Sequence, residues 1–232
     1  HDAVVFMRGN NPLPTLELKS LVGTNLLLNY KSLICRQQSW ILCENQIENV
    51  DKFLIDNWLE RLCFERLEQK SIFIKELLQQ TNDDFEAVLF QLIAKNFGLK
   101  VNGDSFLQLA KSIDFSILRK VSFDEQKLTA LFFGQAGFLE KEVEDSYHQE
   151  LKAEYEYLKY KYNLQPLFNK QFQFFRMRPH NFPTIRIAQL ASLFFTHQNL
   201  FSKLMSITQK EEFYKLFSFS IQEFWKTHFT FE

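Results

Sequence analysis

Two prolines, Pro179 and Pro183, bracket a short segment and constrain its backbone more tightly than any other stretch of the chain. Each proline disfavours helical geometry at the residue before it, and Pro183 suits the first position of a new helix. The chain is therefore predicted to turn sharply at His180 and Asn181. Because apolar residues recur at helical spacing from Thr184, a helix with one buried face should begin directly behind the turn.

Three of the eight arginines of the chain lie in or beside this turn. The free amides and partial positive charge of a helix N-terminus, together with forked guanidinium groups, can hold a phosphate or carboxylate. We therefore expect a site for nucleic acid or another anion, formed by Arg176, Arg178, His180, Asn181 and Arg186. Gln135 and Lys159 would assist if the fold brings them near. In the alternative interpretation, the arginines are structural and pair with acidic side chains or carbonyls of a neighbouring helix.

The composition favours helices. Six glycines and five prolines among 232 residues supply little turn material for an all-β fold, whereas 46% hydrophobic residues, with 27 phenylalanines, support a sizeable core. The predicted fold class is mainly α, a multi-helix orthogonal or bundle-like domain with a short N-terminal β-hairpin.

The hairpin is predicted from two β-prone runs, residues 3–7 and 15–19, which a stretch dense in turn formers separates. Two strands alone are marginally stable, so they should pack on the helices or pair with strands outside this chain. We expect residues 1–45 to be this hairpin and a connecting segment, the end of a missing N-terminal domain, and residues 46–232 to be the helical domain. The chain would then be a fragment of a longer protein.

The clearest helical pattern begins at Asp51, a suitable N-cap, and reaches Gln80. Trp58, Leu59 and Leu62 belong to the stripe that should be buried on this helix. A second helix should follow the cap at residues 82–84 and end at Gly98. Further helices are expected at 105–112, 115–120, from 124, at 146–163, and in short segments after 199 and 208.

Two further patterns leave alternatives open. Gly134 and Gly137 form a G-x-x-G, which clamps a nucleic-acid backbone in KH domains. The three strands of that domain are not evident, so close approach of a neighbouring element is the favoured interpretation. The helix at 146–163 holds five of the seven tyrosines, interleaved with lysines, which suits base stacking or, since several rings share a face, core packing.

Charge and composition also exclude several classes of function. A formal net charge of −1 provides no global attraction to nucleic acid or an anionic membrane, so such binding requires a local patch. No apolar run reaches the ~18 residues of a membrane span, and the three cysteines suggest neither a disulfide framework nor a zinc site. The histidines and the acidic run at 140–145 lack ligand spacing. We predict a cytoplasmic protein without a membrane partner, with no cofactor and no catalytic or metal-ligating residues in this chain.

Several stretches together resemble a known family. These are Trp58-Leu-Glu-Arg-Leu62, Leu131-Phe-Phe-Gly-Gln-Ala-Gly137 and Arg178-Pro-His-Asn-Phe-Pro-Thr-Ile-Arg-Ile-Ala-Gln189. They resemble, over nearly the whole chain, the C-terminal portion of an uncharacterised bacterial family, a domain of unknown function. The resemblance implies longer relatives whose strand-rich, acidic and histidine-containing N-terminal region suits a metal-dependent nuclease of the restriction-endonuclease type. That region precedes this chain, so no catalytic residue is carried over.

We therefore predict a non-catalytic helical binding or scaffolding module of a larger cytoplasmic bacterial protein, which contacts nucleic acid or another anion through its arginine-rich turn. The missing N-terminal domain or another protein is the other expected partner. One alternative is part of a metal-dependent nuclease whose catalytic residues lie in the absent N-terminal region. Another is a structural oligomerisation domain that associates through its phenylalanine-rich C-terminal end.

Overall fold

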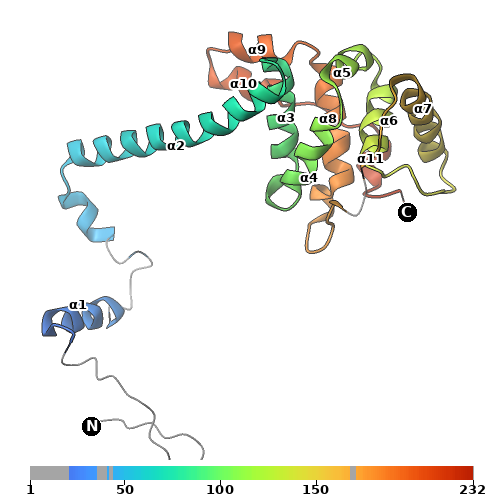
Figure 1. Cartoon of the computed structure of the whole chain (residues 1–232). Coiled ribbons are helices and arrows are strands. Elements are labelled where there is room, and N and C mark those ends of the chain that lie inside the picture. Colours follow the sequence, from blue (N-terminus) through green and yellow to red (C-terminus); the bar gives the residue numbers. More distant parts are fainter. Residues whose placement is uncertain (1–20, 36–40, 42–43, 168–170, 232) are drawn as a thin grey trace, which may run out of the picture. The chain divides into compact units, whose positions relative to one another are not determined.

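The computed structural model describes residues 21–35, 41, 44–167 and 171–231, and these residues form helices and no strand (Figure 1). The prediction of a mainly α fold is confirmed for this part of the chain. The predicted hairpin lies outside the described residues. The chain divides into two compact units, residues 1–69 and 70–232, and the predicted boundary at residue 46 falls inside the first of them.

Three helical elements begin the described chain: α1 (Thr24–Cys35), the 3₁₀ helix η1 (Glu44–Asn49) and α2 (Lys52–Gln80). The division between the two units falls within α2. The carboxylate of Asp51 accepts a hydrogen bond from the backbone N–H of Phe53 at 2.8 Å, which satisfies one of the free amides of the first turn. The predicted cap and the predicted end of this helix are both confirmed.

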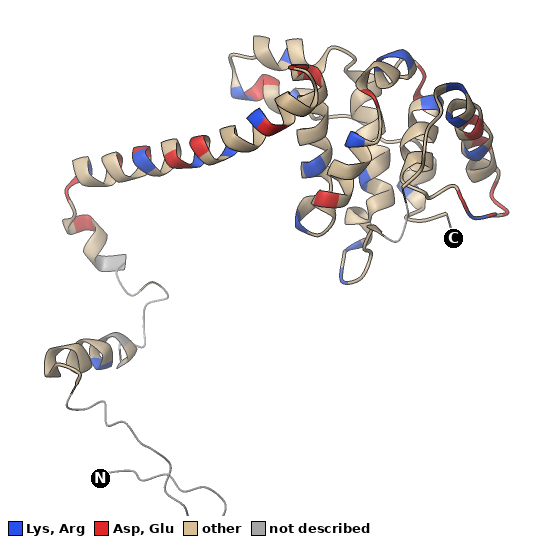
Figure 2. Cartoon of the chain, viewed as in Figure 1, with Lys and Arg blue, Asp and Glu red and all other residues tan. Residues whose placement is uncertain are grey.

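The prediction that α2 buries a stripe through Trp58, Leu59 and Leu62 is wrong. These side chains are 60%, 58% and 46% exposed. Phe64, which lies elsewhere around the helix, is also more than half exposed, so the apolar residues are not confined to one face. Acidic and basic residues alternate between them along the helix (Figure 2).

The second unit consists of short helices: α3 (Phe85–Phe97), α4 (Leu99–Lys111), α5 (Phe115–Val121), α6 (Glu125–Gln135), α7 (Ser146–Tyr162), the 3₁₀ helix η3 (Pro179–Asn181), α8 (Pro183–Thr196), α9 (Leu200–Ser206), α10 (Lys210–Leu216) and α11 (Phe224–Thr227). Helix α6 packs against α7 and α8, and α3 packs against α4, α8 and α9. The helices that the sequence pattern predicts are present, with α4 beginning earlier than expected. Pro183 occupies the first position of α8, as predicted.

Aspartates define where four of these helices begin. The side chains of Asp84, Asp114, Asp124 and Asp145 each accept hydrogen bonds from backbone N–H groups in the first turn of α3, α5, α6 and α7. At α3, Asp84 Oδ1 lies 3.0 Å from two such nitrogens. Each cap satisfies amides that have no partner inside the helix, which fixes the boundary.

The core of the second unit is rich in phenylalanine. Phe106, Phe132 and Phe133 are fully buried, and Trp225 of α11 stacks on Phe133 with ring centroids 4.9 Å apart. Phe231 contacts the same two rings. Trp225 and Phe231 of the C-terminal end thus help to close the core.

A buried polar network links α6 to α7. A Cβ atom at Gly134 would lie 2.0 Å from Cγ of Tyr155, so only glycine admits the tyrosine ring at this position. The Tyr155 hydroxyl donates to Gln135 Oε1 at 2.9 Å, and Gln135 Nε2 donates to the carbonyl of Gln165 at 2.7 Å. The close-approach interpretation of the glycine motif is therefore confirmed at Gly134.

Candidate functional site

The segment that leads into α8, residues 171–182, carries most of the predicted site, and we call it the arginine loop. Its base is fixed by α4. The buried Asn102 donates to the carbonyl of Gln173 at 2.9 Å and accepts from the N–H of the same residue at 2.7 Å. Ser105 donates to the carbonyl of Gln171 at 2.8 Å. These bonds satisfy backbone groups at the base of the loop and hold it in one place.

The rings of the arginine loop point in opposite directions. Phe172 packs edge-on against Phe106 in the core, whereas Phe175 is 81% exposed. The backbone of Arg176 has a φ of 60°, a left-handed conformation that is uncommon for a residue with a side chain. Its guanidinium lies 5.2 Å from the centre of the Phe175 ring. The tip of the loop therefore presents an aromatic ring and a cation together.

The structure separates the predicted site residues into two groups. Arg176, Arg178 and His180 are exposed, and the His180 ring lies edge-on against Phe229. Asn181 and Arg186 meet instead, because the guanidinium of Arg186 donates to Asn181 Oδ1 at 2.6 Å.

The two expected helpers have other contacts. Gln135 belongs to the buried network between α6 and α7, and it is only 1% exposed. Lys159 lies 3.8 Å from the carboxylate of Glu156.

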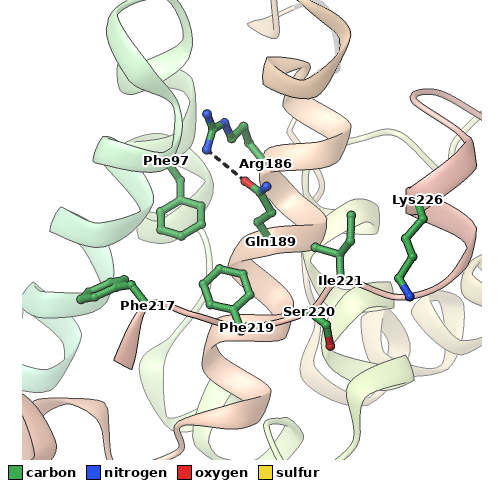
Figure 3. A pocket seen from close by; sticks show the side chains of 8 residues that line it. All are labelled: Phe97, Arg186, Gln189, Phe217, Phe219, Ser220, Ile221 and Lys226. Atoms are coloured by element: carbon green, nitrogen blue, oxygen red, sulfur yellow. Dashed lines mark hydrogen bonds between the residues drawn. The ribbon is translucent and has the colours of Figure 1, made fainter. Parts of the chain in front are cut away.

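Arg186 lines a cavity of about 510 Å³ in the second unit (Figure 3). The lining residues are Phe97, Arg186, Gln189, Phe217, Phe219, Ser220, Ile221 and Lys226. A second guanidinium nitrogen of Arg186 donates to Gln189 Oε1 at 3.0 Å, while its buried Nε has no acceptor among the described residues. Burial lowers the pKa of this guanidinium, which nonetheless stays charged at neutral pH.

A contrasting arginine shows what a structural role looks like in this fold. Arg119 of α5 donates through Nε to Glu86 at 3.1 Å, lies 3.5 Å from Asp84 and stacks over Phe115. It ties α5 to the start of α3. Arg176, Arg178 and Arg186 form no ion pair with any described residue.

The sequence contains a long basic segment, although the net charge of the whole chain is close to zero. Residues 157–210 include eight lysines and arginines and no aspartate or glutamate. This stretch runs from the end of α7 through the arginine loop and α8. In Figure 2 the charged residues drawn in the loop before α8 are all basic. A search for acid-free segments would have located the loop. No local pattern would have added Phe97 or Phe219, which reach the cavity from other elements.

The described residues provide no candidate metal centre. They include no group of three or more His, Cys, Asp or Glu side chains positioned to hold a metal ion. In the acidic run at 140–145, Glu142 pairs with Lys152 at 2.5 Å. The nuclease alternative places its ligands outside this chain and stays a prediction. No helix in the described part of the chain is long and apolar enough to cross a membrane.

Comparison with protein families matches residues 1–232 to the model described as "Protein of unknown function (DUF2851)". The chain belongs to this family. Neither curated proteins nor solved structures gave a match. The resemblance to a domain of unknown function is thus confirmed, while the bacterial origin and the assignment to a C-terminal portion stay predictions. Because the description of DUF2851 states no activity, the function of the chain must be argued from its geometry.

Proposed function

We propose that this DUF2851 chain is the non-catalytic helical binding module of a larger cytoplasmic bacterial protein, and that its arginine loop contacts single-stranded nucleic acid. One observation carries the proposal: the exposed Phe175 stands beside Arg176 and Arg178, neither of which has an acidic partner among the described residues.

The chemistry of the loop tip suits an unpaired strand. An exposed aromatic ring can stack on any base, a contact that contributes about 1–3 kcal/mol, and adjacent cations meet the phosphates. A paired duplex keeps its bases inside and offers no face to Phe175. A single strand uses both the ring and the two guanidinium groups, so it fits the tip better than a duplex.

The loop is also held in place before it binds. Asn102 and Ser105 tie its backbone to α4, and Phe172 inserts into the core. A contact surface that is already ordered loses less conformational entropy on binding than a mobile one. The left-handed backbone at Arg176 is consistent with a tip shaped for a contact, since such geometry persists only where the surroundings impose it.

Local charge supports the same proposal. Across residues 157–210 the formal charge is that of eight cations without a single carboxylate. Charges farther apart than a Debye length, about 8 Å at physiological ionic strength, are largely screened from one another. A phosphate at the loop tip therefore responds mainly to the charges within about that distance, among them Arg176 and Arg178, and only weakly to the net charge of −1.

The test is fluorescence anisotropy with labelled single-stranded DNA and RNA and a labelled duplex at low salt. The double variant R176Q/R178Q should weaken single-strand binding about tenfold, which corresponds to ~1.4 kcal/mol, and F175A should remove the stacking contribution. R61Q/R66Q is the matched control, because it makes the same change of charge at two exposed arginines of α2, away from the loop sequence. That control should bind as the native chain does.

Two results would contradict the proposal. Equal weakening in both double variants would mean that binding depends on total charge and not on the loop. Absence of binding to every nucleic acid at low salt would make the arginine loop a structural element and direct attention to protein partners.

A further inference from the structure

We infer that the cavity at Arg186 binds a small carboxylate with an aromatic body. This site lies apart from the contacts assigned to the loop tip, and the inference does not depend on the proposed function. It depends on the hydrogen-bonding character, the charge and the walls of the cavity.

Some of the donors around Arg186, its buried Nε among them, have no acceptor among the described residues. A guanidinium only donates, so the side-chain oxygens of Asn181 and Gln189 must face it, as their bonds of 2.6 and 3.0 Å require. The NH₂ ends of both amides are then directed elsewhere. Since Gln189 lines the cavity, its NH₂ group and the remaining guanidinium hydrogens form a set of donors. The matching ligand is an acceptor.

The charge of the cavity calls for a single anion. Arg186 is partly desolvated and has only neutral oxygens as partners among the described residues. Lys226 also lines the cavity, but its ammonium already pairs with Glu223 at 2.6 Å. One uncompensated cation is best balanced by one negative charge, and a planar carboxylate can bond a guanidinium through two parallel hydrogen bonds.

The rest of the lining is apolar and largely aromatic. Phe97 and Phe219 stack with centroids 6.5 Å apart and planes 19° from parallel, and Phe217 and Ile221 also line the cavity (Figure 3). The volume of about 510 Å³ lies within the range of small-molecule sites, roughly 300–1,000 Å³. Aromatic walls favour offset or edge-on contact with a ring. The body of the carboxylate is therefore aromatic.

The experiment is saturation-transfer difference and titration NMR with benzoate and 2-naphthoate, and with benzyl alcohol as the uncharged analogue. The native chain should bind both carboxylates and bind benzyl alcohol at least tenfold more weakly. R186Q should lose at least tenfold in affinity for the carboxylates. Q189E, which places an internal carboxylate beside Arg186 with little change in shape, should also block them.

The control for the carboxylate site is R176Q/R178Q, which should bind the carboxylates as the native chain does. Conversely, R186Q should bind oligonucleotides as the native chain does. Failure of this inference is therefore distinguishable from failure of the proposed function. The inference is overturned if neither carboxylate binds the native chain up to its solubility limit. Undiminished binding in Q189E, a variant expected to stay folded, would equally overturn it. Tighter binding of phenyl phosphate than of benzoate would overturn the assignment to a carboxylate.

Discussion

The surroundings of Gln135 and of Gln189 present the same side chain in opposite settings. Gln135 is buried between α6 and α7, where its oxygen accepts from Tyr155 and its nitrogen donates to Gln165. Gln189 lines an open cavity, where its oxygen accepts from Arg186 and its NH₂ group has no partner among the described residues. The first network is complete within the chain, whereas the second has donors left over.

This difference separates stability from binding. A buried polar group without its partner costs roughly 1–3 kcal/mol, so a complete network contributes to folding and is damaged by loss of any member. Donors that face an open cavity can bond to water instead. Removing such a donor therefore changes the free energy of unfolding little. Substitutions around Gln135 should therefore destabilise the protein, and substitutions around Arg186 should weaken the binding of a ligand.

The largest effect should come from closing the space that Tyr155 occupies. In G134A the new methyl group would lie 2.0 Å from the ring, and the buried ring cannot move without disturbing α7, so we expect a loss of about 3 kcal/mol in the free energy of unfolding. Urea denaturation measures it. G23A is the matched control, because nothing lies within 4 Å of a Cβ there. A loss below about 1 kcal/mol in G134A would show that the two helices are not held this closely.

A paired substitution tests the comparison itself. Q135L leaves the Tyr155 hydroxyl and the Gln165 carbonyl without partners and should cost about 2–3 kcal/mol. Q189L removes the same amide group from the cavity and should change the free energy of unfolding by no more than about 0.5 kcal/mol. Denaturant titrations of the two variants give both values. Equal losses would erase the distinction between the complete and the open network.

The smallest expected effect is the pH dependence of stability that comes from Asp124. Hydrogen bonds from the Lys127 side chain, and then from backbone N–H groups, lower the pKa of Asp124 below its ordinary value of 3.8. The stability that this carboxylate contributes is therefore present above about pH 4 and is lost as the pH falls through its folded-state pKa. D124N keeps a capping oxygen but no charge, so its thermal midpoint should lie slightly below that of the native chain at neutral pH.

The difference in midpoint between D124N and the native chain should shrink as the pH falls through the lowered folded-state pKa of Asp124, below which both side chains are neutral. Thermal unfolding followed by circular dichroism across this range measures it. A difference that is independent of pH would mean that the charge of Asp124 is not what stabilises α6.

The sequence predicted the local features of the fold well. Asp51 was expected as a cap, a helix was expected to begin at residue 124, and Pro183 was expected to start α8, because each signal acts on backbone groups within a few residues. The exposure of Trp58 and Leu59 was not predicted. Periodicity locates a helix, but burial depends on what packs against it, and no local pattern contains that information.

The candidate site was predicted only in part. The cluster of arginines before α8 was visible in the sequence, but the division of Arg176 from Arg186 depends on side-chain direction on either side of η3. Phe97 and Phe219 meet only through tertiary packing. The exposed Phe175 looked like its buried neighbours, because alternation within a loop follows no fixed period.

The salt dependence of single-strand binding tests the central claim most directly. Each phosphate contact contributes about −0.7 to the slope of log K against log salt for a single strand, so removal of Arg176 and Arg178 should make the slope less steep by about 1.4. R61Q/R66Q should leave it unchanged. This result would establish that the loop tip contacts phosphates. A slope that is identical in the native chain and in R176Q/R178Q would contradict the account.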